Sequence, residues 1–456
     1  MILEIRDEEV IIAQCTPSGN GALALLRLSG KNTFCIANKI AQLPSKKSIS
    51  QVPTHTIHYG YVIDEQQKHI DQVLFLVMHG PQTFTGQDTV EITCHNNPFI
   101  VEAIINQVIQ HGARLAEPGE FTKRAFLNKK IDLAQAEALN ELIHAHTQKA
   151  LEQSLAQLEG SLSQWITLIE EELIQAISLC EASFEFLEDT VNFDDQIRTI
   201  ISTLLEKITH IANQEDHQQH IKEGIRIALI GSVNAGKSSL FNKLLKKERA
   251  IVTEIPGTTR DVIEAGIYRY QSYITLVDTA GIRQTDELIE KEGIKRSFEE
   301  AARADIILLI IDNSKALSNQ EAEQYNLLRN NFKEKIITVA TKNDLKQKDS
   351  LLDNAAIAVS NKTGQGIEIL ETTISAKINT LLQTSSAYLL TKRQYHLLHQ
   401  LKKDLSQITS MISETVEYEL VSIHLHDTLE KLILLTGKDI TDRSINQIFE
   451  RFCIGK

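Results

Sequence analysis

A short stretch of the sequence has the residue types and spacing of a phosphate-binding loop. It reads Gly231-Ser-Val-Asn-Ala-Gly-Lys-Ser-Ser239 and lies between an apolar run at 225–230 and a helix-like segment at 240–245. Glycines at this spacing let backbone N–H groups and the start of the helix face an anion. We therefore predict that Lys237 contacts the β- and γ-phosphates of a nucleotide and that the Ser238 hydroxyl binds Mg²⁺.

Two segments after this P-loop predict the switches of a GTPase. The segment 253–261 follows the first helix, and Thr258 or Thr259 could complete the coordination of Mg²⁺. The segment 276–281 places Asp278 at the end of a strand, near the metal, and its final glycine can sense the γ-phosphate.

Two further segments predict guanine as the base. The motif Thr341-Lys-Asn-Asp344 ends in a carboxylate that can accept two hydrogen bonds from guanine, and Ser360-Asn-Lys362 matches a loop that backs the base. The first motif usually begins with asparagine and the second usually reads Ser-Ala-Lys, so Thr341 and Asn361 are departures. The predicted nucleotide-binding residues are Asn234, Ala235, Gly236, Lys237, Ser238, Ser239, Thr253, Glu254, Ile255, Pro256, Gly257, Thr258, Thr259, Asp278, Thr279, Ala280, Gly281, Thr341, Lys342, Asn343, Asp344, Ser360, Asn361 and Lys362.

Hydrolysis needs a group that orients water, and the residues alone leave this group open. Ile282 follows Gly281, where a small GTPase carries its glutamine, and an isoleucine cannot orient water. Either the chain hydrolyses GTP very slowly or another residue serves. The acidic stretch 286–290 offers candidates.

Composition bounds the class of protein. The chain has 456 residues and a net charge of −13, which excludes a basic nucleic-acid surface over the whole chain. Its five cysteines are scattered without metal-ligand spacing, which argues against a disulfide framework or a zinc site. We find no signal peptide and no apolar run of membrane-spanning length, and so expect a cytoplasmic protein that does not enter a membrane.

Sequence patterns predict a multidomain protein of α/β and α parts. Residues 1–120 form an α+β domain, and residues 223–378 alternate apolar strands with helices, which predicts a mostly parallel sheet covered on both faces. Residues 121–222 and 379–456 are helical, and we expect them to pack together as one discontinuous domain. The apolar spacing across 151–169 predicts one long helix.

These motifs resemble the MnmE (TrmE) family of tRNA-modification GTPases over the whole chain. Three segments are similar to its G domain: Asn234-Ala-Gly-Lys-Ser-Ser239, Gly257-Thr-Thr-Arg-Asp261 and Asp278-Thr-Ala-Gly281. Phe126-Leu-Asn-Lys-Lys-Ile-Asp-Leu-Ala-Gln-Ala-Glu137 is similar to the family's junction of N-terminal and helical domains, and Phe452-Cys-Ile-Gly-Lys456 to its C-terminal signature. The resemblance implies a Ras-like G domain inserted into the helical domain, and an N-terminal domain that dimerises and binds folate.

The resemblance also implies a mechanism of GTP hydrolysis. K⁺ would stimulate it when the two G domains of a homodimer meet across their nucleotides. The implied K⁺ ligands are Asn234, Thr253, Ile255 and Thr258. Glu290 matches the family's glutamate that orients the attacking water through a bridging water. Together with Lys237 of the P-loop, it is a predicted catalytic residue.

A folate site follows from the same resemblance. Arg27, Glu91, Lys130 and Lys456 match positions that bind 5-formyl-tetrahydrofolate or a related one-carbon folate. The chain departs from the family at Asn20, where an arginine is usual, and at His95-Asn-Asn97, where His-Gly-Gly is usual. Cys453 could be a nucleophile, but a packing or positioning role is favoured, since thiol reactivity depends on a basic partner and the sequence alone cannot place one beside it in space.

For function, the resemblance implies modification of tRNA with an FAD-dependent partner of the MnmG (GidA) type, in a heterotetramer. The two proteins would add an aminomethyl or carboxymethylaminomethyl group at C5 of the wobble uridine. The alternative is a regulatory GTPase, for example in ribosome assembly, without a role in base modification. The P-loop by itself is compatible with both.

Overall fold

The computed structural model describes residues 8–19, 21–185, 193–246, 263–270, 272–278, 298–345, 356–382, 387–412, 417–438, 442–450, 452–453 and 455. Its contacts divide the chain into two compact units. The first consists of Met1–Ile143, Leu155–Ile208 and Thr391–Lys456, and the second of His144–Ser154 and Thr209–Leu390. The boundaries of the four predicted domains remain a prediction.

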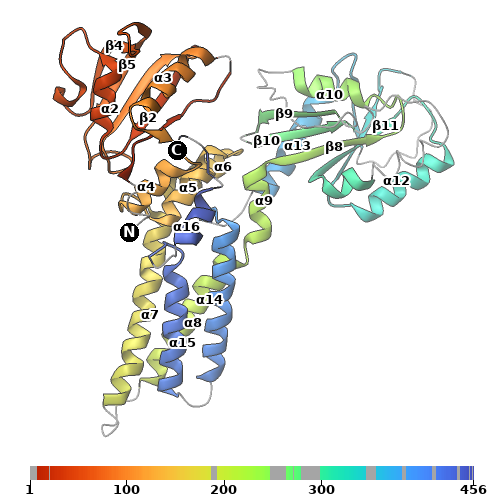
Figure 1. Cartoon of the computed structure of the whole chain (residues 1–456). Coiled ribbons are helices and arrows are strands. Elements are labelled where there is room, and N and C mark those ends of the chain that lie inside the picture. Colours follow the sequence, from red (N-terminus) through yellow and green to blue (C-terminus); the bar gives the residue numbers. More distant parts are fainter. Residues whose placement is uncertain are drawn as a thin grey trace. The chain divides into compact units, whose positions relative to one another are not determined.

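The N-terminal part of the first unit is a mixed sheet (Figure 1). Its described strands lie in the order β3-β4-β5-β6-β2-β1-β7. β1 pairs antiparallel with β2 and parallel with β7. The strands are β1 (Ile11–Gln14), β2 (Leu23–Ser29), β3 (Ala41–Gln42), β4 (Thr56–Ile63), β5 (His69–Met78), β6 (Thr89–His95) and β7 (Arg114–Leu115).

Two helices build the core of this sheet by covering one of its faces. They are α2 (Thr33–Ile40) and α3 (Pro98–Gln110), and a short 3₁₀ helix, η1 (Ile49–Gln51), packs with α2. Alternate strand residues such as Leu26, Phe75 and Ile92 are fully buried with Ile104 of α3. This alternation is what a sheet with one covered face requires.

The helices of the first unit come from both helical segments of the chain (Figure 1). α15 packs against α7 and α14, and α16 packs against α4. Leu133 of α5 shares a buried cluster with Ile445 and Phe449 of α16. The expected packing between the two segments is therefore observed. The helices that lie within this unit are α4 (Glu120–Leu127), α5 (Leu133–Ile143), α7 (Ser161–Glu185), α14 (Lys392–Met411), α15 (Tyr418–Ile433) and α16 (Asp442–Phe449). Two more, α6 (Gln148–Leu158) and α8 (Asp194–Ala212), are divided between the two units, with most of α6 in the second.

One prediction in this region is wrong, because residues 151–169 form two helices. α6 ends at Leu158 and α7 begins at Ser161. Gly160 lies between them with φ +100°, a conformation that glycine adopts without steric cost and that ends a helix. Leu151 and Leu155 are 41% and 46% exposed, so the apolar spacing does not mark one continuous buried stripe.

The second unit contains the predicted nucleotide-binding sheet (Figure 1). Its described strands lie in the order β13-β12-β11-β8-β10-β9, and all pairs are parallel except β10 with β9. The strands are β8 (Ile225–Gly231), β9 (Ile263–Arg269), β10 (Ser272–Asp278), β11 (Ile306–Asp312), β12 (Ile336–Thr341) and β13 (Ile357–Ala358). The helices described here also include α9 (Glu215–Glu223), α10 (Lys237–Lys246), α12 (Asn319–Asn331) and α13 (Ile367–Leu382).

Helices cover both faces of this sheet, as predicted. Leu229 of β8 packs into a core with residues of α10 and α13, whereas its neighbour Ile230 packs into a second core with Tyr325 of α12. Burial on both faces explains why β8 and β11 read as continuous apolar runs. Because the strands are parallel, the carboxyl ends of β8, β10, β11 and β12 meet at one edge, where the polar motifs follow.

Candidate functional site

The phosphate-binding loop joins β8 to α10. Asn234 and Gly236 have positive φ values, +60° and +94°, which turn the loop back toward the helix. A Cβ on Gly231 would lie 2.2 Å from the backbone oxygen of Ile310 on β11, so this position requires glycine. The glycines therefore allow both the turn and the close approach of the neighbouring strand.

Lys237 begins α10, and its side chain lies inside the loop. It is only 5% exposed, and Nζ donates to the carbonyl oxygens of Gly231 at 2.6 Å and Ser232 at 2.7 Å. Burial lowers the pKa of this ammonium group, and the charge of Asp278 opposes that shift. The arrangement holds a cationic donor against the loop, where phosphate oxygens are expected.

Ser238 and Asp278 form the predicted metal-side pair. The Ser238 hydroxyl donates to Oδ2 of Asp278 at 2.7 Å, and Asp278 is buried at the end of β10. Hydroxyl and carboxylate oxygens are the ligands that Mg²⁺ prefers, so this pair fits that ion. Within the described residues no cluster of three or more His, Cys, Asp or Glu side chains could hold a metal, so an ion here would also need oxygens from elsewhere.

The base-recognition residues lie at the ends of β12 and β13. Ser360 is buried, and its hydroxyl donates to Oδ1 of Asp344 at 2.7 Å. This hydrogen bond lowers the pKa of Asp344 and favours the ionised carboxylate that two guanine N–H groups would need. Lys342 has φ +59° and pairs with Asp312 at 2.6 Å, and the hydrogen bond from Lys342 lowers the pKa of Asp312 against the effect of burial.

The P-loop also has a contact that its own residues did not predict. The backbone N–H of Ser232 donates to the hydroxyl of Tyr325 on α12, at 2.9 Å. Tyr325 is buried in the core on that face of the sheet, which raises its pKa. No spacing rule connects a helix tyrosine with a loop some ninety residues earlier, so only the folded chain reveals this support.

Several predicted site residues lie outside the part of the chain that the structure describes. The roles predicted for them at the nucleotide and folate sites stay predictions. They are Asn20, Thr253, Glu254, Ile255, Pro256, Gly257, Thr258, Thr259, Thr279, Ala280, Gly281, Ile282, Glu290 and Lys456, together with the acidic stretch 286–290.

Two of the predicted folate residues meet on the N-terminal sheet. Arg27 and Glu91 are register partners on β2 and β6, and Arg27 Nε donates to Glu91 Oε1 at 2.7 Å. The Arg27 guanidinium also lies over the rings of Phe84 and Phe121, 5.8 and 5.6 Å from their centroids. Lys130 follows α4 and donates from Nζ to the carbonyl oxygen of Pro81 at 3.0 Å.

The C-terminal tail lies beside Arg27 on the N-terminal sheet. The Gly455 carbonyl oxygen accepts from Cys15 Sγ at 3.0 Å and from Arg27 Nη1 at 3.5 Å. Gly455 has φ +92°, and a Cβ there would lie 2.7 Å from the Gln14 carbonyl oxygen. Cys453 is half-buried, and its carbonyl oxygen accepts from the N–H of Gly119 at 3.3 Å. The tail is thus anchored by backbone contacts beside Arg27 and Glu91.

The departures at 95–97 have local structural roles. His95 pairs with Asp71 through Nδ1 at 2.8 Å, and the Asn96 amide donates to the Gly19 carbonyl oxygen at 2.9 Å. Asn97 is the N-cap of α3, where its side chain accepts from the N–H of Phe99. Its φ of −107° shows that this position does not require glycine.

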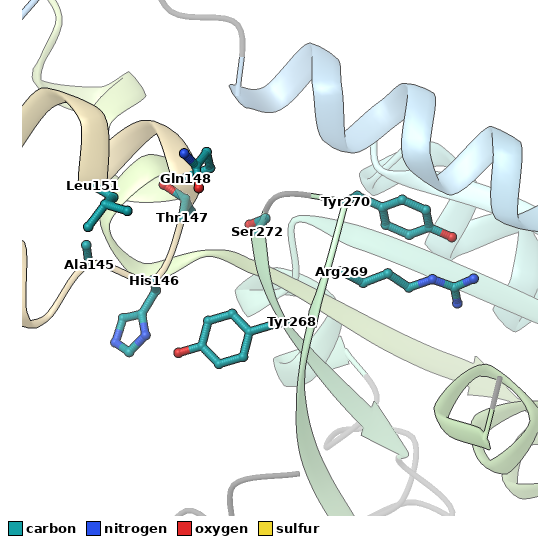
Figure 2. A pocket seen from close by; sticks show the side chains of 9 residues that line it. All are labelled: Ala145, His146, Thr147, Gln148, Leu151, Tyr268, Arg269, Tyr270 and Ser272. Atoms are coloured by element: carbon teal, nitrogen blue, oxygen red, sulfur yellow. The ribbon is translucent and has the colours of Figure 1, made fainter. Parts of the chain in front are cut away.

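A separate hollow of about 470 Å³ lies in the second unit (Figure 2). It is lined by residues 145–148 and Leu151 and by the β9–β10 hairpin, and it shares no residue with the nucleotide motifs. Tyr273 N donates to the His146 carbonyl oxygen at 2.8 Å, which joins the two sides. The hollow is therefore distinct from the phosphate loop.

The fold and the P-loop region together define the class of protein to which the chain belongs. A mostly parallel sheet with helices on both faces, a lysine inside the loop after β8 and a carboxylate in the guanine motif are the features of a P-loop GTPase. No described helix is long and apolar enough to cross a membrane.

Comparison with known proteins identifies the family. The family described as GTP-binding protein TrmE N-terminus matches residues 10–130, and the MnmE helical domain family matches residues 133–453. The tRNA modification GTPase MnmE of Lachnoclostridium phytofermentans is 36% identical over 98% of this chain and 99% of its own length. That of Bacillus licheniformis is 37% identical over 98% of this chain and 100% of its own. The chain belongs to the MnmE family of tRNA modification GTPases, and it is a GTP-hydrolysing enzyme.

Proposed function

We propose that this enzyme uses GTP turnover to modify the wobble uridine of certain tRNAs. It would act as a cytoplasmic homodimer, in a heterotetramer with an FAD-dependent MnmG (GidA)-type partner, and add an aminomethyl or carboxymethylaminomethyl group at C5. The match to tRNA modification GTPases over 98% of the chain supports this proposal most strongly.

The phosphate end of the site supports GTP as the energy source. Lys237 would contact the phosphates, while Ser238, with Thr259 beyond the described residues, would hold Mg²⁺. Asp344, kept ionised by Ser360, would select guanine. A bound Mg²⁺ or K⁺ would neutralise charge on the phosphates. The loop's other groups would orient the nucleotide and exclude water.

For hydrolysis, we propose that Asn234 helps to hold K⁺ and that Glu290 orients the attacking water. Asn234 lies in the loop with its backbone in a left-handed turn, at the position that the family resemblance assigns to the ion. Asn234→Ala should remove the advantage of K⁺ over Na⁺ in GTP turnover. An unchanged K⁺/Na⁺ ratio would contradict the assignment.

Glu290 can be tested separately from nucleotide binding. Glu290→Ala should lose GTP hydrolysis while its affinity for GDP stays the same, because the carboxylate would act on water and not on the nucleotide. Continued turnover in this variant would remove Glu290 from the mechanism.

The N-terminal site would bind the one-carbon folate. Arg27 is well suited to a folate carboxylate, because it is half-buried, lies over two aromatic rings and is oriented by Glu91. Glu91, Lys130 and Lys456 complete the proposed set. When bound, the folate would supply the one-carbon unit, and the FAD of the partner would supply the redox chemistry.

Mass spectrometry of tRNA nucleosides tests the proposal as a whole. Cells that lack this protein should lose a wobble-uridine modification, and the wild-type gene should restore it, whereas a Lys237→Ala gene should not. An unchanged nucleoside profile would instead indicate a regulatory GTPase without a role in base modification.

A further inference from the structure

Two departures from the usual guanine motifs meet at the P-loop. Thr341 stands where asparagine is usual, and Asn361 stands where alanine is usual. The Thr341 hydroxyl donates to the carbonyl oxygen of Ala235 at 2.5 Å, and the Asn361 amide donates to that of Gly236 at 3.3 Å. The two side chains thus hold consecutive peptide groups of the same loop.

The contacts converge on one point of the backbone. A Cβ built on Gly236 would lie 3.5 Å from Asn361 Nδ2 and 3.7 Å from both Cβ and Oγ1 of Thr341. Thr341 is fully buried at the end of β12, and Asn361 follows the buried Ser360. The loop after β12 and the loop after β13 therefore both contact the turn that precedes Lys237.

Threonine and asparagine side chains differ in the number of protons that they can donate. The Thr341 hydroxyl has one proton, and it lies near two acceptors, the carbonyl oxygens of Ala235 at 2.5 Å and Ile311 at 3.2 Å. An asparagine amide carries two N–H donors. With threonine at 341, this position supplies one donor fewer, and Asn361 supplies a donor from the neighbouring loop.

Further contacts fix the position of Asn361. Lys243 of α10 donates from Nζ to its backbone oxygen at 2.9 Å. Its Oδ1 is buried and accepts no hydrogen bond from the residues that the structure describes. Turning the amide over would bring this oxygen against the Gly236 carbonyl oxygen. The N–H contact is therefore what the side chain contributes.

We propose that Thr341 and Asn361 form a split clamp, in which two side chains divide the donor role that one asparagine could fill at position 341. Asn361 is a positioning residue that keeps the P-loop in register with the guanine loop. The clamp sets how long a guanine nucleotide stays bound. It concerns nucleotide binding alone and is independent of the reaction on tRNA.

A double-mutant cycle on the full-length protein tests the clamp. Fluorescent GDP is loaded in the presence of Mg²⁺, and its dissociation rate is measured for wild type, Asn361→Ala, Thr341→Asn and the double variant. Loss of one hydrogen bond in Asn361→Ala should speed dissociation about fivefold. The double variant regains an asparagine at 341, so its rate should return to within about twofold of wild type.

Controls separate positioning from general damage. Asn330→Ala, an exposed change at the end of α12, should leave dissociation unchanged. Without nucleotide, the melting temperature of Asn361→Ala should fall by no more than about 4 °C, because a single hydrogen bond contributes about 1 kcal/mol. Should this variant fail to fold, Asn361→Asp replaces it, because a carboxylate has no N–H and should also speed dissociation.

Two results would overturn the clamp. One is an unchanged dissociation rate in Asn361→Ala. The other is an equal effect of Asn361→Ala with threonine and with asparagine at 341, because independent residues give additive effects.

Discussion

A buried carboxylate of one helical segment pairs with donors from the other segment. Removing its charge should lower the free energy of unfolding of the first unit. Glu137 of α5 is 5% exposed and accepts from Arg393 Nε at 2.8 Å and Nη2 at 2.7 Å. It also accepts from Gln394 Nε2 at 2.7 Å and from the Thr391 hydroxyl at 3.3 Å. These donors come from the start of α14, more than 250 residues later in the chain. Glu137→Gln removes the charge and turns an N–H group toward these donors.

The structure sets the size of the effect. Breaking a buried ion pair costs about 3–5 kcal/mol, and the lower end applies because the Arg393 side chain is 23% exposed to water. A loss of about 3 kcal/mol in a unit of this size lowers the melting temperature by about 6–12 °C.

Thermal unfolding of the full-length protein, with and without GDP, measures this loss. GDP should raise the melting temperature of the second unit alone, because only that unit binds it. The unfolding transition whose temperature GDP does not change therefore belongs to the first unit. Glu159→Gln is a matched control, since Glu159 is exposed just after α6. A shift in Glu137→Gln no larger than in this control would refute the reasoning.

Three further outcomes follow from particular contacts. Lys237→Ala should lower GTP turnover at least about 100-fold in a phosphate-release assay, because the ammonium group that would contact the phosphates is lost. The variant should still fold, because burial already disfavours this charge and lowers its pKa. Gly455→Ala should release the C-terminal tail, since its Cβ would clash with Gln14, and thiol labelling of Cys15 should then rise while GTP turnover persists; unchanged labelling would contradict the docking. The hydrogen bond to Asp305 raises the pKa of His220 against burial, so this pair should stabilise the second unit below about pH 6.5 and lose that effect as pH rises through the raised pKa. Calorimetry of His220→Gln should therefore show a deficit at pH 5.5 that disappears at pH 8.5, and an equal deficit at both would refute this.

The sequence alone determined the parts of this protein that depend on neighbouring residues. The strands β8, β10, β11 and β12 follow from apolar runs buried on both faces, and the P-loop follows from glycines at fixed spacing. Helix α3 was predictable from an amphipathic pattern that begins at Pro98 and ends before Gly112. The class of protein follows from the order of these motifs, because their chemistry lies within short segments.

Tertiary structure alone decided the contacts between distant segments. A periodic pattern of apolar residues cannot show that Gly160 divides it, because the pattern records which residues are apolar and not the backbone angle of +100° that the glycine adopts between α6 and α7. The Tyr325 hydroxyl at the P-loop and Gly455 beside Arg27 join residues 93 and 428 positions apart, which no local spacing encodes. Thr341 and Asn361 each look like a weakened motif in the sequence. In the fold they contact consecutive carbonyl groups, because parallel strands bring both loops to the same edge of the sheet.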